Sequence, residues 1–339
     1  MQPGFFDLDE RHQQLEKLGD PLPRLAKVVD WEGFRPVLEK VHQKERKSNA
    51  GRKPFDVVVM FKVLVLQHMY NLADEQTEYQ IRDRYSFCRF LGLTPEGRVP
   101  DARTIWLFRE RLKTQELVEE LFAGLMRQVE AAGYIARRGQ IVDASLVSAP
   151  RQRNRREENE ALKNGQTPQG WEDKPAMRRQ KDTDARWTKK HGKTYFGYKN
   201  HLSIDRENKL VRHFEVTDAA VHDSQVFDRV LAETNTSADV WADSAYRSAQ
   251  REVELKATGY RSHIQTKGTA TRKLSERATQ ANHRRAKIRA RVEHVFAAQT
   301  AMGGMLVRTI GIARARVKIG MMNIVYNLRR WAYLEARCA

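Results

Sequence analysis

The sequence predicts an α/β protein in which an all-helical N-terminal domain precedes a mixed-sheet core. Residues 1–135 contain apolar runs that suit helices. After Gly133 the pattern changes to adjoining β-like runs, followed by strands that alternate with helices. That order is typical of an α/β domain with a mixed sheet. The length of 339 residues is enough for two domains with sizeable cores.

Helix signals dominate the first domain. Pro54 is expected at the first position of a helix over residues 55–70, and a second helix is expected over 77–90. Asp101 should cap a third helix, and a fourth, over 115–132, should end at Gly133. Two such helices with basic flanks could bind DNA as a helix–turn–helix. An ordinary helical bundle explains the same pattern, and both interpretations stay open.

The second domain is predicted to begin with a strand and a hairpin. Residues 140–147 form the strand, and 193–204 and 209–216 form the hairpin around the polar turn 205–208. Shorter segments follow, with strands over 239–242 and 263–266 and helices over 223–233, 246–258 and 280–299. Residues 150–192 interrupt this domain. They are polar and poor in large aliphatic side chains, so we expect them to be flexible unless a partner such as DNA orders them.

The chain is strongly basic, with 61 Lys and Arg against 43 Asp and Glu, a net charge of +18. Much of the positive charge is clustered, at residues 151–156 and 284–291. Such fields favour a polyanionic partner, above all nucleic acid, although scattered exposed Lys and Arg would be the plainer explanation.

Cysteine content and hydropathy indicate the cellular compartment in which the protein acts. Two cysteines make neither a disulfide scaffold nor a cysteine-based zinc site. The first residues lack a signal-peptide core, and the most apolar run, 57–66, is interrupted by Lys62. We therefore expect a cytoplasmic protein without a membrane partner, acting at the bacterial nucleoid if DNA is its substrate.

Two carboxylates occupy unusual positions in the predicted sheet. Asp143 lies within the apolar strand IVDASL, and Asp243 directly follows a later strand, in VWADSAY. A buried carboxylate costs free energy unless it is paired. If the two strands are neighbours, the carboxylates repel each other and one pKa rises, a conflict that a divalent cation such as Mg²⁺ removes.

Glu293, in RARVEHVF, is a third candidate ligand. It borders the apolar stripe of a predicted basic helix, next to small residues that would let the helix approach the sheet. Helix geometry alone favours a plainer role, an ion pair with Arg289 one turn earlier.

The motifs together resemble the DDE transposases of bacterial insertion sequences, most closely the insertion-sequence-five family. The resemblance runs from about Ala50 to Trp331. Its motifs are GRKPFDVVVMFKVLVLQHMYNLAD, VPDARTIWLFRERL, VDASLVSAP, KTYFGYKNHLSID, TDAAVHDS, ADSAYRS and IRARVEHVF. The resemblance implies an RNase H-like catalytic core and assigns the catalytic triad to Asp143, Asp243 and Glu293, against the plainer role for the last residue.

The resemblance also implies the reaction and its partners. Transposon ends are cleaved and the freed 3′-OH joins target DNA, with two Mg²⁺ ions (Mn²⁺ as a substitute) and with a homodimer. In the family's Tyr, Arg, Glu, Lys signature, Arg289 and Glu293 match, whereas Ala286 replaces the Tyr and Thr300 the Lys. Expected DNA contacts are Arg289, Lys199, Asn200, His201, Tyr246, Arg247, Arg284, Arg285, Lys287 and Arg291.

Other roles remain open at this stage. Each DNA-contact residue could be an ordinary surface or hairpin residue. We expect Asp223 to cap the helix that follows it, with His222 as a further residue that could reach DNA. The residues 301–339 should end in a helix that packs on the core. A metal-dependent nuclease on the same core, or a DNA-binding protein without catalysis, are the alternative functions.

Overall fold

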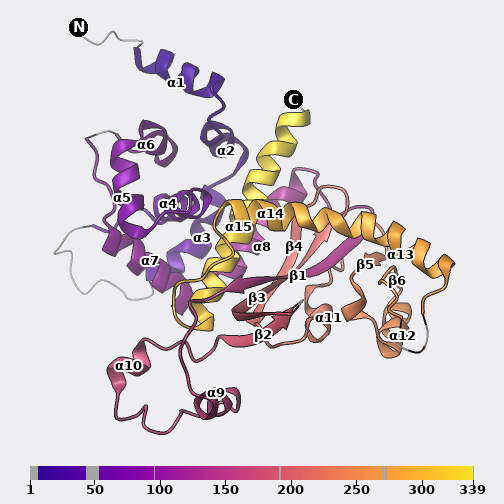
Figure 1. The fold of residues 1–339 in the computed structure, drawn as a ribbon. Coiled ribbons are helices and arrows are strands. Elements are labelled where there is room, and N and C mark those ends of the chain that lie inside the picture. The colour runs from indigo at the N-terminus through magenta and orange to yellow at the C-terminus, as the bar shows by residue number, and fades with distance from the viewer. Residues whose placement is uncertain are drawn as a thin grey trace. The chain divides into compact units, whose positions relative to one another are not determined.

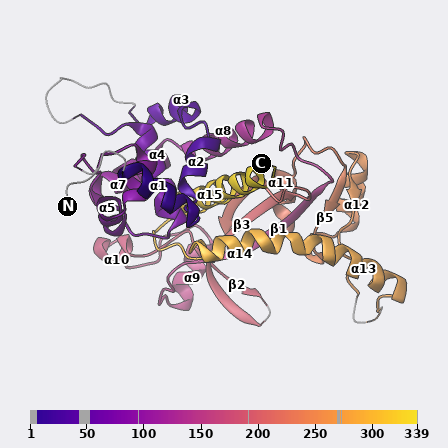
Figure 2. The same cartoon turned by 90° about the horizontal axis from the view of Figure 1, so that it is seen from above.

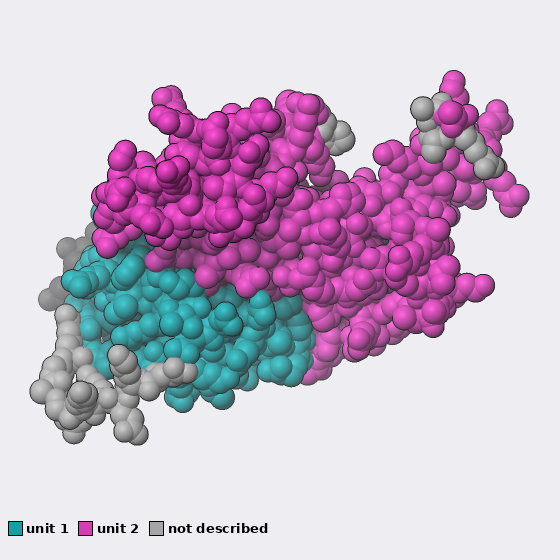
Figure 3. Space-filling view, turned by 90° about the horizontal axis from the view of Figure 1, so that it is seen from below, with its two compact units in different colours: residues 1–128, 328–339 teal, residues 129–327 magenta. Residues whose placement is uncertain are grey.

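A computed structural model describes residues 7–42, 53–94, 96–190, 192–268, 271 and 273–338. The chain forms two compact units, distinguished by colour in Figure 3. The first comprises residues 1–128 and 328–339, and the second comprises 129–327. The boundary falls between Gln128 and Val129, close to the expected one near residue 135, but the last residues of the chain belong with the first unit.

The first unit is helical throughout its described part. Its elements are α1 (Asp7–Lys17), α2 (Leu22–Val28), η1 (Glu32–Phe34), α3 (Arg35–Leu38), η2 (Glu39–His42), α4 (Val57–Met69), α5 (Asp74–Asp83), α6 (Tyr85–Leu91), α7 (Ala102–Thr114) and the start of α8 (Leu117–Ala131). Apolar α4 is almost entirely buried and forms the centre of this unit.

Side-chain capping explains where these helices begin. The Asp56 carboxylate accepts the N–H of Val58 at 2.8 Å, so α4 begins at Val57, and the prediction that Pro54 opens it is wrong. Asp101 caps α7 as predicted, accepting the N–H of Thr104 at 2.6 Å. The single helix predicted over 77–90 is two helices, because Arg84 between them has an extended backbone.

No single helix in the described ranges is long and apolar enough to cross a membrane. By length and composition alone, α4 and α5 would pass together, but they are bent by 104° at their junction.

The second unit is built on a six-stranded mixed sheet. Its strands are β1 (Gln140–Ser148), β2 (Arg186–Lys190), β3 (Lys193–Asp205), β4 (Val211–Asp218), β5 (Asp239–Trp241) and β6 (Arg261–Ser262). The order is β2-β3-β1-β5-β6, with β4 paired to β3 beside β2. The central strand β1 pairs antiparallel with β3 and parallel with β5. This is the mixed sheet that the sequence predicts, and it fits the RNase H-like core that the resemblance implies.

The predicted hairpin is confirmed as β3 and β4, joined by the turn after Asp205. The buried Asp205 carboxylate accepts the N–H of Asn208 at 2.6 Å and pairs with Arg212 at 2.9 Å. Lys209 adopts a φ of 58°, a turn conformation, so β4 begins at Val211 rather than at residue 209.

Short elements connect and cover the strands. They are η3 (Asp223–Gln225), α11 (Phe227–Val230), η4 (Ser244–Tyr246) and α12 (Ala249–Ala257). The predicted helix over 223–233 is therefore only two short turns, and the strand predicted over 263–266 lies at Arg261–Ser262 instead. The shift has a clear origin, since Arg261 pairs with Asp239 of β5 through backbone register and a 2.9 Å ion pair.

The segment over 150–192 is folded, which contradicts the expectation that it is flexible without a partner. It contains α9 (Arg156–Lys163), α10 (Pro175–Arg179) and β2. Trp171 is buried, and its indole N–H donates to Glu158 at 2.9 Å. The Tyr198 hydroxyl of β3 donates to the buried Asp182 carboxylate at 2.7 Å. A few buried side chains thus form a small core in this segment, which its polar composition does not indicate.

A helical stretch lies across the strands of the second unit (Figures 1 and 2). It comprises α13 (Glu276–Arg289), η5 (Ala290–Val292) and α14 (Glu293–Ala301), where one helix over 280–299 was predicted. α13 contacts β5, and η5 contacts β1. The last helix, α15 (Ile312–Cys338), begins in the second unit and ends in the first. Within the second unit its Asn323 and Asn327 bond to β3 and β4, as expected of a helix packed on the core.

Candidate active site

The two predicted aspartates lie at the same level of adjacent parallel strands. The register of β1 and β5 aligns Gln140 with Val240 and Ile141 with Trp241. Two residues further along each chain stand Asp143, still within β1, and Asp243, just past the end of β5. The Asp243 carboxylate accepts the N–H of Ala245 at 2.8 Å, which ends the strand and starts the η4 turn.

The Asp143 carboxylate is buried, and neighbouring charges affect its pKa. Its residue is 7% exposed. Burial raises its pKa to about 6 and the charge of Asp243 acts in the same direction, while Arg289 and the N–H of Ala144 oppose the rise. This direction is the one expected for like charges on adjacent strands.

Arg289 provides the direct partner of this carboxylate. Its Nη1 donates to Asp143 Oδ2 at 2.6 Å, which joins α13 to β1. The alternative expected from helix spacing, an ion pair between Arg289 and Glu293, does not form among the described residues. Arg289 is therefore at the site, held by the first carboxylate rather than by the third.

Glu293 stands at the first position of α14, directly after the η5 turn that contacts β1. Its side chain is exposed, and no hydrogen bond or ion pair involves it within the described ranges. Among the residues described, no group of three His, Cys, Asp or Glu side chains is close enough to hold one metal ion. Asp143 and Asp243 thus stand at matching levels of adjacent strands, and with Glu293 they do not form a three-carboxylate group among the residues described.

The residues present suit a divalent cation in part. Two carboxylates that repel each other, one of them buried, offer the hard oxygen ligands that Mg²⁺ prefers. Mg²⁺ keeps several of its waters, so two protein ligands are a workable start.

A third aspartate, Asp223, lies in η3 and was predicted to cap the helix that follows it. That prediction is wrong, because His222 occupies the cap position of η3 and accepts the N–H of Ser224. The Asp223 carboxylate instead pairs with Lys199 of β3 at 2.8 Å, and η3 contacts the η4 turn that follows Asp243. Its position directly after the motif TDAAVH is the sequence signal that could have suggested this pairing.

Tyr246 lies among these acidic groups. It is buried, and its hydroxyl has no hydrogen-bond partner among the residues that the structure describes. Burial together with the charges of Asp143, Asp223 and Asp243 raises its pKa well above the ordinary value. A buried hydroxyl without a partner is costly, and such groups concentrate at functional sites.

Three of the expected DNA contacts prove to be core residues. Asn200 is 1% exposed and bonds to Asn323 of α15 at 3.0 Å. His201 is equally buried and bonds to Thr217 of β4 at 2.9 Å. With Tyr246 also buried, none of the three presents a side chain to a DNA surface, so these expectations are corrected to structural or site-lining roles.

The remaining predicted contacts divide into two groups. Arg284 and Lys287 are exposed on α13. The others already have partners in the structure. Lys199, Arg285 and Arg291 are partly buried and bond to Asp223 and to the carbonyls of Ile264 and Arg206, in that order, whereas Arg247 is exposed and donates to the carbonyl of Ile264.

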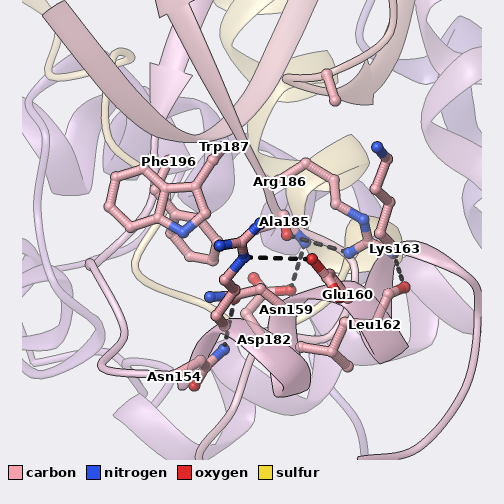
Figure 4. A pocket seen from close by; sticks show the side chains of 12 residues that line it. Asn154, Asn159, Glu160, Leu162, Lys163, Asp182, Ala185, Arg186, Trp187 and Phe196 are labelled. Atoms are coloured by element: carbon pink, nitrogen blue, oxygen red, sulfur yellow. Dashed lines mark hydrogen bonds and ion pairs between the residues drawn. The ribbon is translucent and has the colours of Figure 1, made fainter.

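A cavity of about 560 Å³ lies beside the folded insert (Figure 4). Its walls come from α9 and from the ribbon of β2 and β3, including Trp187 and Phe196, whose ring centroids are 5.1 Å apart. The cavity is distinct from the aspartate pair: it contains neither Asp143 nor Asp243.

Comparison with known proteins identifies the same two parts of the chain. A family model described as "Transposase domain (DUF772)" matches residues 9–111, and one described as "Transposase DDE domain" matches residues 135–328. A cryo-EM structure of the piggyBac transposase synaptic complex with hairpin DNA is also similar. It has a TM-score of 0.48 and 12% sequence identity, over 94% of this chain and 76% of that chain.

These matches confirm the resemblance to insertion-sequence DDE transposases and leave the closer relation to the insertion-sequence-five family a prediction. Enzymes of the DDE type depend on a divalent metal, in agreement with the carboxylate pair on β1 and after β5. Because the DDE model spans more than half of the 339 residues, this chain belongs to the DDE transposases, enzymes that cleave DNA and transfer its strands.

Proposed function

We propose that Asp143, Asp243 and Glu293 are the catalytic carboxylates of this transposase. The observation that supports the proposal most strongly is the alignment of Asp143 and Asp243 on the adjacent parallel strands β1 and β5. Glu293 joins them by a shift of its exposed side chain at the start of α14. Two Mg²⁺ ions, with Mn²⁺ as a substitute, are the proposed complement.

The proposed reaction has two displacements at phosphorus. Water attacks the phosphodiester at a transposon end, the P–O3′ bond breaks, and a 3′-OH is released. That 3′-OH attacks a target phosphodiester in the same way and displaces the target's own 3′ oxygen. When bound, the metal ions supply charge stabilisation for the attacking and leaving oxygens. No covalent link to the protein is needed.

The side chains of the site prepare it for this chemistry. Arg289 neutralises Asp143 in the structure as it stands, at 2.6 Å. When a cation takes over that neutralisation, the guanidinium becomes available for a DNA phosphate, which it can bind through two hydrogen bonds. The exposed Arg284 and Lys287 extend the same helix as a basic surface for the DNA.

Two transposon ends must be brought together for transposition, so we propose that the enzyme acts as a homodimer at the nucleoid. The helical unit, which carries the first family match, is the proposed site of end recognition. Light scattering with and without end DNA measures the assembly state.

Single substitutions of the carboxylates test the site. Asp143→Asn, Asp243→Asn and Glu293→Gln should each abolish cleavage of a duplex that carries the terminal repeat of the element, while DNA binding persists. Asp228→Asn is the matched control, since Asp228 is an exposed carboxylate that pairs with Arg251. Cleavage at the wild-type rate by any of the three variants would remove that residue from the site. Cleavage without strand joining by the wild type would indicate a nuclease instead.

A further inference from the structure

The segment that follows β6 runs beside β5 as far as the second aspartate. The N–H of Gln265 donates to the carbonyl of Ala242 at 3.1 Å, in the same parallel sense as the pairing of β5 with β6. Thr266 and Asp243 are the next residues of the two segments. The segment therefore brings Thr266 to the end of β5 at which the proposed catalytic aspartate stands.

Two arginines meet on this segment. Arg247 Nη1 donates to the carbonyl oxygen of Ile264 at 3.0 Å and to the hydroxyl of Thr266 at 3.1 Å. Arg285 Nη1 donates to the same two oxygens, at 3.0 and 3.3 Å. The two nitrogens are therefore no further apart than two hydrogen-bond lengths. Two cations from distant parts of the chain, called here the arginine pair, thus share two neutral acceptors.

The arginine pair has little negative charge around it. Arg247 lies 3.5 Å from Glu252, which also accepts a hydrogen bond from the Ser262 hydroxyl. Arg285 forms no ion pair with a carboxylate in the part of the chain that the structure describes. Burial and the charge of Arg247 both lower the pKa of Arg285, as expected when like charges are held together. An anion bound to both guanidinium groups would relieve this repulsion.

The segment after β6 is also held by a residue other than the arginine pair. Asn282 of α13 accepts the N–H of Thr266 at 3.0 Å and donates to its carbonyl at 2.8 Å. Both arginines bond to the segment through Nη1, and no described residue accepts a hydrogen bond from either Nη2. A guanidinium binds a phosphate through two of its N–H groups. The arginine pair therefore keeps donors for a phosphate while it holds the segment.

The arginine pair lies next to the proposed carboxylate site. Arg285 and Arg289 are one turn apart on α13, on the same face, and Arg289 Nη1 donates to Asp143 Oδ2 at 2.6 Å. Arg247 is separated from Asp243 only by the short turn η4. Figure 1 shows α13 passing the part of the sheet that contains β5. Each arginine is thus within about one helical turn of a residue of the site.

We propose that Arg247 and Arg285 together bind one DNA phosphate close to the scissile phosphate. The position of this phosphate relative to the reaction rests on the proposed site at Asp143 and Asp243. The phosphate supplies the negative charge that the arginine pair lacks, and its oxygens accept the remaining N–H groups. The contact is to the DNA backbone, so it positions the strand in the site without reading its sequence.

Single neutral linkages in the DNA test the proposal directly. Methylphosphonates replace, one at a time, the phosphates around the cleaved bond in a duplex that carries the terminal repeat, and fluorescence anisotropy measures affinity in EDTA. One linkage should weaken binding by the wild type at least about tenfold, as expected for a lost charged hydrogen bond. The same linkage should weaken binding by Arg247→Gln/Arg285→Gln less than about twofold, because the two changes remove one contact. Equal losses in both proteins would overturn the proposal.

Salt dependence distinguishes one shared phosphate from two separate ones. Each phosphate contact on B-DNA contributes about 0.9 to the slope of log affinity against log salt, so the double variant should lose about that much. A loss of about twice this value would contradict a shared phosphate. Arg229→Gln/Arg316→Gln is the matched control, because these half-exposed arginines also approach one common acceptor, Glu215. The control should keep the wild-type loss at the sensitive linkage.

Folding and the proposed site are checked separately. Each single variant leaves the other arginine and Asn282 bonded to the segment, so Arg247→Gln and Arg285→Gln should melt at the wild-type temperature while each lowers the loss at the sensitive linkage. Asp143→Asn should keep that loss in EDTA and should not cleave. If Asp143→Asn still cleaves, the carboxylate assignment fails, and the linkage data still decide whether the arginine pair binds a phosphate. A sensitive linkage remote from the cleaved bond would overturn the placement proposed here.

Discussion

Arg289 Nη1 donates a hydrogen bond to Asp143 Oδ2 at 2.6 Å, and this contact joins the basic helix α13 to the central strand β1. The guanidinium lies next to the buried Asp143 carboxylate and compensates its negative charge. It opposes the rise in the pKa of Asp143 that burial causes. A cation at the site and Arg289 are therefore alternative sources of the same neutralisation.

Arg289→Met should destabilise the metal-free protein, because it leaves Asp143 buried with less compensation. Loss of one partner of a charged hydrogen bond costs about 1–3 kcal/mol, and the partial exposure of Arg289 favours the lower end. Mg²⁺ should restore much of the loss. Thermal unfolding with EDTA and with Mg²⁺ measures both effects. Arg284→Met, on the exposed face, is the control, and equal behaviour of the two variants would contradict the interpretation.

Tyr246→Phe and Tyr198→Phe should have opposite effects on stability. The Tyr246 hydroxyl is buried without a partner in the described part of the chain, so its removal should leave stability unchanged or raise it by up to about 1 kcal/mol. The Tyr198 hydroxyl donates to the buried Asp182 carboxylate, so its removal should cost about 1–3 kcal/mol. Urea unfolding gives both values. If Tyr246→Phe is stable but cleaves slowly, the hydroxyl has a positioning role at the site; a loss of stability like that of Tyr198→Phe would indicate a structural bond instead.

His201 should make stability depend on acidity. Burial lowers its pKa from 6.5 to about 4, against the opposing charge of Asp223 and with small contributions from Lys199 and Arg229. The unfolded state binds the proton more readily than the folded state. The stability from this group is therefore complete above pH 6.5 and is lost as the pH falls towards 4, by at most about 3 kcal/mol.

The raised pKa of Asp143 acts with the opposite sign in part of the same range, so His201 must be isolated by difference. His201→Gln keeps a polar side chain opposite Thr217 but cannot titrate. The unfolding free energy of the wild type minus that of this variant should increase from pH 4 to 6.5 and then level off. A flat difference would show that His201 is not held neutral by the fold.

Asn323→Ala should destabilise the second unit by about 2–4 kcal/mol. Asn323 is fully buried and links Asn200 of β3, at 3.0 Å, with Gln299 of α14, at 2.7 Å. Truncation removes a hydrogen bond from each of two buried amides and opens a cavity. Chemical denaturation measures the loss. Asn282→Ala is the comparison and should cost less, because Asn282 is partly buried and its side chain bonds to the backbone of Thr266.

The sequence by itself was sufficient for the main strands of the sheet and for the places of Asp143 and Asp243 relative to them. The strand with Asp143, the hairpin after it and the strand before Asp243 follow from local patterns of apolar residues and turns, which act over a few neighbouring positions. Capping shows the same locality: Asp101 caps α7 as expected. Pro54 and Asp56 both mark a possible start for α4, and the sequence pattern alone predicted the wrong one.

Only the tertiary structure decided which side chains meet. Arg289 bonds to Asp143 rather than to Glu293, and Asp223 pairs with Lys199 rather than capping a helix. Asn200 and His201 lie in the core, although polar residues on a hairpin suggest a surface. These outcomes depend on packing between segments that are far apart in sequence. The free energy of a buried polar group depends on its hydrogen-bond and ion-pair partners. These partners come from distant parts of the chain, so a local sequence pattern does not reveal them.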